Sequence, residues 1–255
     1  MNSEWTSRYE AAVEAARQAG SLALTYYESN LEVEWKQDHS PVTRADRETE
    51  SLLRKVLLSK FPTDGFLGEE QGDQPGTSGY RWIVDPIDGT RSFVRGIPIW
   101  ATLVGLEYKE EPIAGVCFIP VWATTYRALK GDGAYRDDRR IHVSAVADLK
   151  DSMLFYSSSS WFQKTGKVRE FLDLAGRVQR SRGFGDFYGF VLVAQGSGEL
   201  MVDHGVHVWD VAGIKVIVEE AGGKFSDWEG NPSIHRPDVI ASNGKVHEAA
   251  LGLLR

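Results

Sequence analysis

Residues 85–90 carry the strongest chemical signal in this chain of 255 residues. Two carboxylates and a hydroxyl stand there within six positions: Asp85, Asp88 and Thr90. Pro86 fixes its own φ and Gly89 permits a tight turn, so these groups and the Ile87 carbonyl can point at one spot. Carboxylate, carbonyl and hydroxyl oxygens are hard ligands that suit Mg2+ rather than Zn2+. The segment therefore predicts a magnesium site; the simpler alternative is a loop in which an aspartate caps the next helix.

Two distant segments add further carboxylates. Glu69 and Glu70 follow a short apolar stretch, as residues after a strand would, and Asp210 lies where a helix is predicted to begin. Each observation has an ordinary explanation, because adjacent glutamates are usually solvated and an aspartate often caps a helix. Together with residues 85–90, they form a pattern of carboxylates spread over three parts of the chain.

If the chain brings these segments and the upstream Asp46 together, they would form a strongly acidic pocket of Asp46, Glu69, Glu70, Asp85, Asp88 and Asp210. A phosphate monoester is a dianion that such a pocket repels, unless bound cations reverse the local charge. Two Mg2+ ions can lower the pKa of a bound water, hold the phosphoryl oxygens and stabilise the leaving alkoxide. Backbone amides near Gly89 and Thr90, where a short helix is expected to begin, add donors for an anion. The residues thus predict hydrolysis of a phosphate ester by water, without a phosphoenzyme.

These segments, in this order and at this spacing, resemble the inositol monophosphatase superfamily of magnesium-dependent, lithium-sensitive phosphatases, over nearly the whole chain. The resemblance implies that Glu69, Asp85 and the Ile87 carbonyl bind one metal ion. It implies that Asp88 and Asp210 bind a second ion, with Asp85 bridging the two. The expected cofactor is therefore Mg2+, as two or three ions.

The same resemblance gives roles to a hydroxyl and to a loop upstream. Thr90 matches the residue that orients the attacking water. Residues 38–46 resemble the family's mobile loop, in which Asp46 pairs with the Thr90 position and, with Glu69, marks a weaker third metal site. Thr90, Asp46 and Glu69 are thus the expected catalytic residues, while Gly89, Thr90 and Asp210 are expected to contact the substrate.

Two stretches, residues 92–103 and 182–189, resemble the histidinol-phosphate phosphatase subgroup of the superfamily. Inositol-specific members tend to carry a small uncharged turn at the position of Gly185 and Asp186, and a glutamate at the position of Asp203. Physically, the carboxylates of Asp186 and Asp203 suit a substrate with an ammonium and an imidazole better than a neutral polyol. The alternatives are that Asp186 caps the following helix and that Asp203 only ends a strand.

The expected function is magnesium-dependent hydrolysis of L-histidinol phosphate to L-histidinol and phosphate, in histidine biosynthesis. Phe187 departs from the cysteine that the subgroup carries at that position. The alternatives are an inositol-1-monophosphatase, a 3'-phosphoadenosine nucleotidase and, in a different class, a non-catalytic metal- or phosphate-binding regulator. The intact acidic set argues against the regulator, because a protein without turnover has no need of two metal ions.

Four further residues have weaker claims on the site. Glu70 adds a neighbouring carboxylate, and Lys36 could hold phosphate or water but could equally be solvated. Arg95 could contact the substrate or a neighbouring subunit, with an exposed salt bridge as the alternative. His207 directly precedes the helix of Asp210 and is expected to be structural, with a role in the site as the alternative.

The composition excludes several other classes of function. The net charge is −7 and no stripe of Lys and Arg interrupted by aromatics is present, which argues against a nucleic-acid partner. The single cysteine, Cys117, excludes an intrachain disulfide, fits a cytoplasmic location and is expected in the core. The polar N-terminus and the lack of a run of about 18 apolar residues argue against a membrane. The expected partner is a small phosphate monoester, and the resemblance adds a homodimer.

Periodicity predicts the elements that position these residues. Helices are predicted over residues 9–26, 47–61, 166–174, 187–195 and 210–221, with a last one from about residue 245. Strands are predicted over residues 81–84, 100–106, 113–119, 123–129, 152–156, 177–181, 200–202, 224–226 and 239–241. Pro86 is expected to end the ladder of the first of these strands, and residues 131–133 are expected to form a turn.

These elements predict two domains. Residues 1–148 form a strand-rich α+β domain with most of the metal ligands, and residues 149–255 form an α/β domain with Asp210 and the specificity residues. The resemblance implies the arrangement: a layered αβαβα sandwich of the inositol monophosphatase and fructose-1,6-bisphosphatase type, with the site between the two halves.

Overall fold

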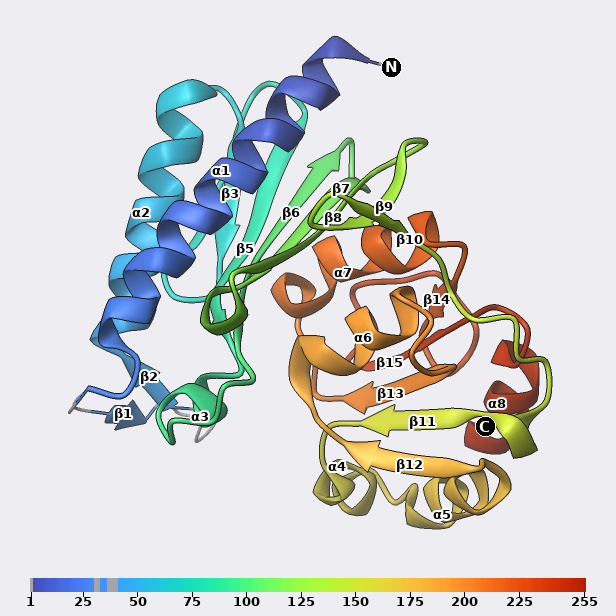
Figure 1. The fold of residues 1–255 in the computed structure, drawn as a ribbon. Helices are drawn as coiled ribbons and strands as arrows, with labels where there is room; N and C mark the ends of the chain where they lie inside the picture. The colour runs from blue at the N-terminus through green and yellow to red at the C-terminus, as the bar shows by residue number, and fades with distance from the viewer. Residues whose placement is uncertain (1, 30–32, 36–40) are drawn as a thin grey trace.

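The elements of the chain stack in five alternating layers of helix and sheet (Figure 1). The computed structural model describes residues 2–29, 33–35 and 41–255. Two helices cover the outer face of the first sheet, two lie between the sheets, and three cover the outer face of the second sheet. This is the layered αβαβα sandwich that the resemblance implied.

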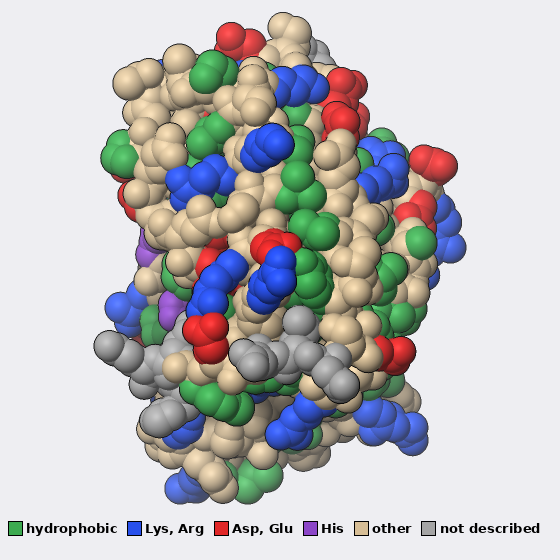
Figure 2. Space-filling model, turned by 90° about the vertical axis from the view of Figure 1, so that its left-hand side faces the viewer, with side chains coloured by type: hydrophobic (Ala, Val, Ile, Leu, Met, Phe, Trp, Pro, Cys, Tyr) green, Lys and Arg blue, Asp and Glu red, His purple; other side chains and the backbone are tan. Residues whose placement is uncertain are grey.

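Helices α1 (Ser3–Tyr26) and α2 (Arg44–Lys60) form the first layer. The buried face of α1 consists largely of alanine: Ala11, Ala12, Ala15, Ala16, Ala19 and Ala23. Small side chains at helical spacing let the helix lie close to the sheet. On the outer face of this layer acidic and basic side chains are mixed (Figure 2), and two ion pairs there join Arg44 to Glu48 and Arg47 to Glu34.

The first sheet has eight strands in the order β10-β9-β8-β7-β6-β5-β3-β4. Their bounds are β3 (Gly65–Gly68), β4 (Gly72–Gln74), β5 (Tyr80–Asp88), β6 (Ala101–Tyr108), β7 (Glu111–Ile119), β8 (Thr124–Leu129), β9 (Gly133–Arg136) and β10 (Arg139–Ile141). All neighbours are antiparallel except β3 and β5, which are parallel. A separate two-stranded ribbon, β1 (Val33–Trp35) and β2 (Pro41–Thr43), precedes α2.

Strand β5 continues beyond Pro86, so the prediction that this proline ends the ladder was wrong. The register with β6 shifts between Asp85 and Asp88, as it does at a β-bulge. A bulge removes two residues from the regular pairing, so the proline at position 86 need not donate a hydrogen bond. Its carbonyl accepts a hydrogen bond from Thr102 Oγ1 at 2.9 Å. The bulge lets the strand carry both aspartates to the site.

The central layer consists of α6 (Asp186–Ala194) and α7 (Val208–Glu220), which pack against both sheets and are apolar on nearly all sides. Helix α7 touches the backbone of the first sheet through glycines. A Cβ at Gly115 of β7 would lie 1.9 Å from the Gly213 carbonyl oxygen, and one at Gly105 of β6 would lie 2.9 Å from the Gly213 nitrogen. This contact fixes the height of α7, and hence of Asp210, over the sheet.

The second sheet has five strands in the order β12-β11-β13-β15-β14. Their bounds are β11 (Met153–Tyr156), β12 (Arg180–Gly183), β13 (Leu200–His204), β14 (Lys224–Ser226) and β15 (Asp238–Ser242). Helices α4 (Ser159–Lys164), α5 (Val168–Arg177) and α8 (His247–Leu254) form the last layer. Three short helical turns complete the elements: α3 (Thr90–Phe93), η1 (Pro120–Trp122) and η2 (Leu149–Asp151).

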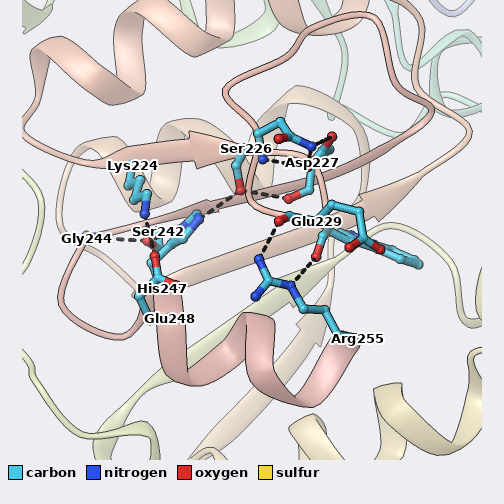
Figure 3. Close-up of polar contacts among 11 residues, drawn as sticks. Lys224, Ser226, Asp227, Glu229, Ser242, Gly244, His247, Glu248 and Arg255 are labelled. Atoms are coloured by element: carbon cyan, nitrogen blue, oxygen red, sulfur yellow. Dashed lines mark hydrogen bonds and ion pairs between the residues drawn. The ribbon is translucent and has the colours of Figure 1, made fainter.

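A buried histidine joins α8 to the second sheet (Figure 3). His247 Nδ1 lies 2.8 Å from Ser242 Oγ, and its Nε2 lies 2.9 Å from Ser226 Oγ. The Ser226 hydroxyl donates to the Asp227 carbonyl at 2.7 Å, so His247 Nε2–H must donate to Ser226 and Nδ1 must accept from Ser242. Burial lowers the pKa of His247 to about 4, and the nearby Lys224 adds to this effect.

The remaining sequence expectations can be compared with these elements. Cys117 is buried in the core and unpaired, as predicted. The residues around 131–133 form a turn, in which the Gly131 and Gly133 amides donate to the Glu220 carboxylate at 2.9 and 2.8 Å. None of the helices in the described part of the chain combines the length and apolar character needed to cross a membrane.

Candidate active site

A cavity of about 600 Å3 opens where the end of β5 meets the starts of α6 and α7. Four aspartates from these elements and from β13 line it: Asp88, Asp186, Asp203 and Asp210. Its other walls include serines that follow β11 and the ring of Trp161 on α4. The first sheet, the central layer and the second sheet therefore all contribute side chains to one space.

Asp85, Asp88 and Asp210 come together at this cavity, which Asp88 and Asp210 line. One carboxylate oxygen from each lies within 4.8 Å of the corresponding oxygens of the other two. Asp85 and Asp88 flank the bulge of β5, and Asp210 lies in the first turn of α7. The Asp210 Oδ2 accepts a hydrogen bond from His207 N–H at 2.7 Å, which holds the carboxylate at the start of its helix. Three carboxylates at this separation can share a cation.

Among the residues that the structure describes, the charges that most affect the pKa values of Asp85 and Asp88 are those of other carboxylates. Burial raises the pKa of Asp85 well above its usual value, and the negative charges of Glu69 and Asp88 raise it further. The pKa of Asp88 is raised well above its usual value by burial and then by Asp186 and Asp210. Closely spaced carboxylate oxygens are the hard ligands that Mg2+ takes in proteins, so the residues present fit the ion. The effect of Glu69 on Asp85 places that carboxylate beside the cluster.

Thr90 lies between the Ile87 carbonyl and Asp46. Its Oγ1 is 2.9 Å from the Ile87 oxygen and 3.3 Å from Asp46 Oδ1. The other Asp46 oxygen, Oδ2, accepts hydrogen bonds from Thr43 N–H and from Thr43 Oγ1, both at 2.7 Å. Asp46 is fully buried, and burial is the main cause that raises its pKa. One oxygen of Asp46 therefore holds the start of α2 while the other faces Thr90.

Gly89 lies directly after Asp88, where the backbone passes very close to the start of α6. Its φ is +89°, and a Cβ there would lie 2.9 Å from the Ile99 carbonyl oxygen and 3.2 Å from Asp186 Oδ2. Asp88 Oδ2 accepts a hydrogen bond from Phe187 N–H at 2.7 Å. A glycine is required here by both the backbone angle and the close approach of Asp186. These contacts join β5 to α6.

Asp186 and Asp203 face the same cavity. Asp186 is the first residue of α6, with φ +50°, and Gly185 occupies the cap position, so Asp186 is not the helix cap that was considered from the sequence. Its pKa is raised to about 6, by burial and then by Asp210, while Arg91 opposes the shift. Asp203 is 5% exposed; burial raises its pKa to about 7, and Ser157 and the His204 amide limit the rise.

Three of the four less certain candidates, Glu70, Arg95 and His207, have surroundings that the structure describes. Glu70 donates its backbone N–H to Glu50 at 2.7 Å. His207 lines a neighbouring hollow, and its ring stacks on Trp209 with 4.9 Å between ring centres. Arg95 lines a separate hollow of about 220 Å3 next to α3. Lys36 and residues 38–40 lie outside the described residues.

Several residues of the site were not found from the sequence. Ser157, His204 and Trp161 line the cavity. The Trp161 ring packs against Gly205, where an added Cβ would lie 2.7 Å from the ring. This ring also lines a second hollow of about 570 Å3, so it borders both spaces. The serine-rich stretch before Trp161 gave no chemical signal, because no sequence pattern of serines and a tryptophan predicts that they line a cavity.

Comparisons with known proteins agree with this geometry. The profile of the inositol monophosphatase family matches residues 4–255. A histidinol-phosphatase from Streptomyces coelicolor is 41% identical over 234 residues, 88% of each chain, and an inositol-1-monophosphatase from Rhizobium meliloti is 37% identical over 93% of this chain and 92% of its own. The crystal structure of the extragenic suppressor protein suhB from Bartonella henselae covers 96% of this chain and 97% of its own, with a TM-score of 0.91 and 32% identity. The chain belongs to the inositol monophosphatase family.

Proposed function

We propose that this protein is a magnesium-dependent phosphomonoesterase that hydrolyses L-histidinol phosphate to L-histidinol and phosphate, as a step of histidine biosynthesis. The observation that carries the proposal is the presence of two further carboxyl groups, the half-buried Asp186 and the buried Asp203, in the cavity that Asp88 and Asp210 also line. A phosphate ester of a neutral alcohol offers these two groups no cation.

One part of the cavity provides for the phosphate. Asp85, Asp88 and Asp210, with Glu69 and the Ile87 carbonyl, would hold Mg2+, which supplies positive charge for the phosphoryl oxygens and makes water more acidic. Asp46 Oδ1 can accept a hydrogen bond from the Thr90 hydroxyl. The Thr90 oxygen can then accept a hydrogen bond from a water molecule. Thr90 and Asp46 would thereby orient that water toward phosphorus.

Another part of the cavity provides for the leaving group. Asp203 Oδ1 accepts hydrogen bonds from the Ser157 hydroxyl and from His204 N–H, the latter at 2.7 Å. Oδ2 accepts none from any residue that the structure describes. An ammonium or imidazolium placed there would favour the ionised form of Asp203 and make a charge-assisted hydrogen bond. L-Histidinol phosphate carries both an amine and an imidazole.

The relatives support this choice of substrate and also the second candidate. The Streptomyces coelicolor relative at 41% identity is named a histidinol-phosphatase. The Rhizobium meliloti relative at 37% identity is named an inositol-1-monophosphatase, which makes inositol 1-phosphate the second candidate substrate. We also propose inhibition by lithium and a homodimer, from the family resemblance, and a cytoplasmic location, from the single cysteine. Lithium inhibition can be measured in the assay below, the dimer by sedimentation equilibrium, and the location by cell fractionation.

The test is phosphate release by the purified protein with Mg2+ from L-histidinol phosphate, inositol 1-phosphate and adenosine 3',5'-bisphosphate. We expect a strong preference for L-histidinol phosphate that a chelator abolishes. Preference for another ester would leave the metal site in place and refute the role of Asp186 and Asp203. Undiminished turnover after chelation would refute the magnesium mechanism.

A further inference from the structure

Glu50 on α2 is a fully buried carboxylate whose hydrogen bonds go to backbone amides. Its Oε2 accepts from Glu70 N–H at 2.7 Å and its Oε1 from Gln71 N–H at 2.8 Å. Burial raises the pKa of Glu50, and the two amides oppose the rise. Because each oxygen is used by a different amide, the carboxylate holds two consecutive peptide groups of the turn between β3 and β4.

That turn carries Glu69. Gly68 pairs with Val84 in the parallel register of β3 and β5, so Glu69 and Asp85 follow equivalent positions on neighbouring strands. The pKa effect of Glu69 on Asp85 agrees with this placement. The position of the turn therefore decides whether the Glu69 carboxylate reaches the metal cluster.

The chain leaves space for Glu50 beneath the strand end. A Cβ at Gly68 would lie 2.3 Å from the carboxyl carbon of Glu50, so any side chain at position 68 would displace the carboxylate. Helix α2 also holds Asp46, one turn before Glu50 and on the same buried face. Helix α2 thus fixes the distance between Asp46, which contacts Thr90, and the turn that carries Glu69.

We propose that Glu50 is a positioning residue for the metal site, which holds the 69–71 turn so that Glu69 can bind the ion beside Asp85. The inference rests on the proposed metal dependence but not on which phosphate ester is the substrate. Groups that orient metal ligands without touching the metal commonly change its affinity about 10- to 100-fold when they are removed.

The test is calorimetric titration of Mn2+, an ion that takes the same oxygen ligands as Mg2+, into the wild-type protein and Glu50→Gln. The glutamine keeps the length of the side chain but has one acceptor oxygen, and its NH2 group would face an amide N–H. We expect the Kd for Mn2+ to rise about tenfold. Gly68→Ala displaces the carboxylate without removing it and is expected to raise the Kd as well.

Asp64→Asn is the matched control. Asp64 is also a buried carboxylate, and it directly precedes the other end of β3. It accepts hydrogen bonds from Arg8 Nε at 2.8 Å, Arg8 Nη2 at 3.0 Å and Ser78 Oγ at 2.7 Å. The asparagine variant should lower the Tm and leave the Kd for Mn2+ unchanged.

The outcomes separate the two proposals. A wild-type Kd in Glu50→Gln, or an equal rise in Glu50→Gln and Asp64→Asn, would overturn the positioning role, because the residue would then only stabilise the fold. If the wild-type protein binds no Mn2+ at all, the proposed metal-dependent function itself fails, and the role of Glu50 fails with it.

Discussion

The two oxygens of Asp203 have different surroundings. Among single residues, this difference offers the most direct test of substrate specificity. Both hydrogen bonds to this carboxylate end on Oδ1, from Ser157 and from the His204 amide. The side chain is 95% hidden, yet it lines the cavity. One oxygen therefore anchors the side chain and the other is presented to a ligand.

Asp203→Asn separates these two roles. The asparagine oxygen can keep both anchoring hydrogen bonds, while its NH2 group places a donor where a cation is expected to bind. A hydrogen bond to a charged group contributes about 1.5–3 kcal/mol. We therefore expect kcat/KM for L-histidinol phosphate to fall about 10- to 100-fold, and kcat/KM for inositol 1-phosphate to change much less. Equal losses on the two esters would show that Asp203 acts through the fold.

The sequence located the carboxylates that the structure brings together, but it did not locate much of the cavity wall around Asp203. Asp85, Asp88 and Thr90 are close in the chain, so their spacing alone brought them together, and Asp210 was added by resemblance. Trp161 and Glu50 gave no signal, because their roles depend on which distant backbone lies next to them. Gly68 is an example: the need for a glycine at this position is evident only from the structure, in which the Glu50 carboxyl group lies against it.

At the scale of elements, the position of α7 depends on contacts between backbones. Three glycines, Gly105, Gly115 and Gly213, allow α7 to lie directly on β6 and β7. Such a contact cannot be relieved by a change of rotamer, since no side chain is present to move. The first turn of α7 holds Asp210, so an error in this contact would be transmitted to the metal cluster.

Gly115→Ala should destabilise the protein and weaken the metal site together. The added methyl group would lie 1.9 Å from the Gly213 carbonyl oxygen. Overpacking of this kind costs about 1–3 kcal/mol. We expect the midpoint of urea unfolding to fall and the Mg2+ concentration for half-maximal activity to rise. Gly176→Ala on α5 is the control, because no atom lies within 4 Å of its new Cβ; it should stabilise the helix by about 0.5–1 kcal/mol.

Periodicity located most elements but not their ends. Helix α1 begins at Ser3 rather than residue 9, because the Asn2 side chain accepts the Glu4 N–H at 3.0 Å and caps it. Helix α4 was missed, and β12 starts at Arg180 instead of residue 177. Short elements such as α4 carry too few residues for a period to be recognised, and their existence depends on packing against neighbours.

At the scale of the whole molecule, acid acts on this protein in two opposite ways. The raised pKa values of Asp85, Asp88 and Asp203 mean that the folded protein takes up protons at these groups more readily than the unfolded chain does. Mild acid therefore relieves repulsion in the cavity. His247 behaves in the reverse sense, because burial keeps it neutral in the folded state.

The His247 contribution to stability should be lost as the pH falls. Its pKa is lowered from 6.5 to about 4, so between these values the unfolded chain binds more protons than the folded protein. By linkage, the contribution is fully present above pH 6.5 and declines through this window by about 3 kcal/mol. Urea unfolding at several pH values, for wild type and His247→Gln, should show that the two curves converge toward pH 4. Parallel curves would contradict this role.

The ring of Trp161, which lines both the 600 Å3 cavity and the 570 Å3 hollow, has a consequence for the evolution of the substrate range. The groups proposed to bind phosphate belong to β5, α2 and α7, whereas the wall proposed to face the leaving group comes from α4, α6 and β13. Mutation can therefore reshape one end while selection preserves the other. Replacement of this one aromatic side chain could therefore admit the phosphate ester of a bulkier alcohol, while the groups that hydrolyse the ester stay unchanged.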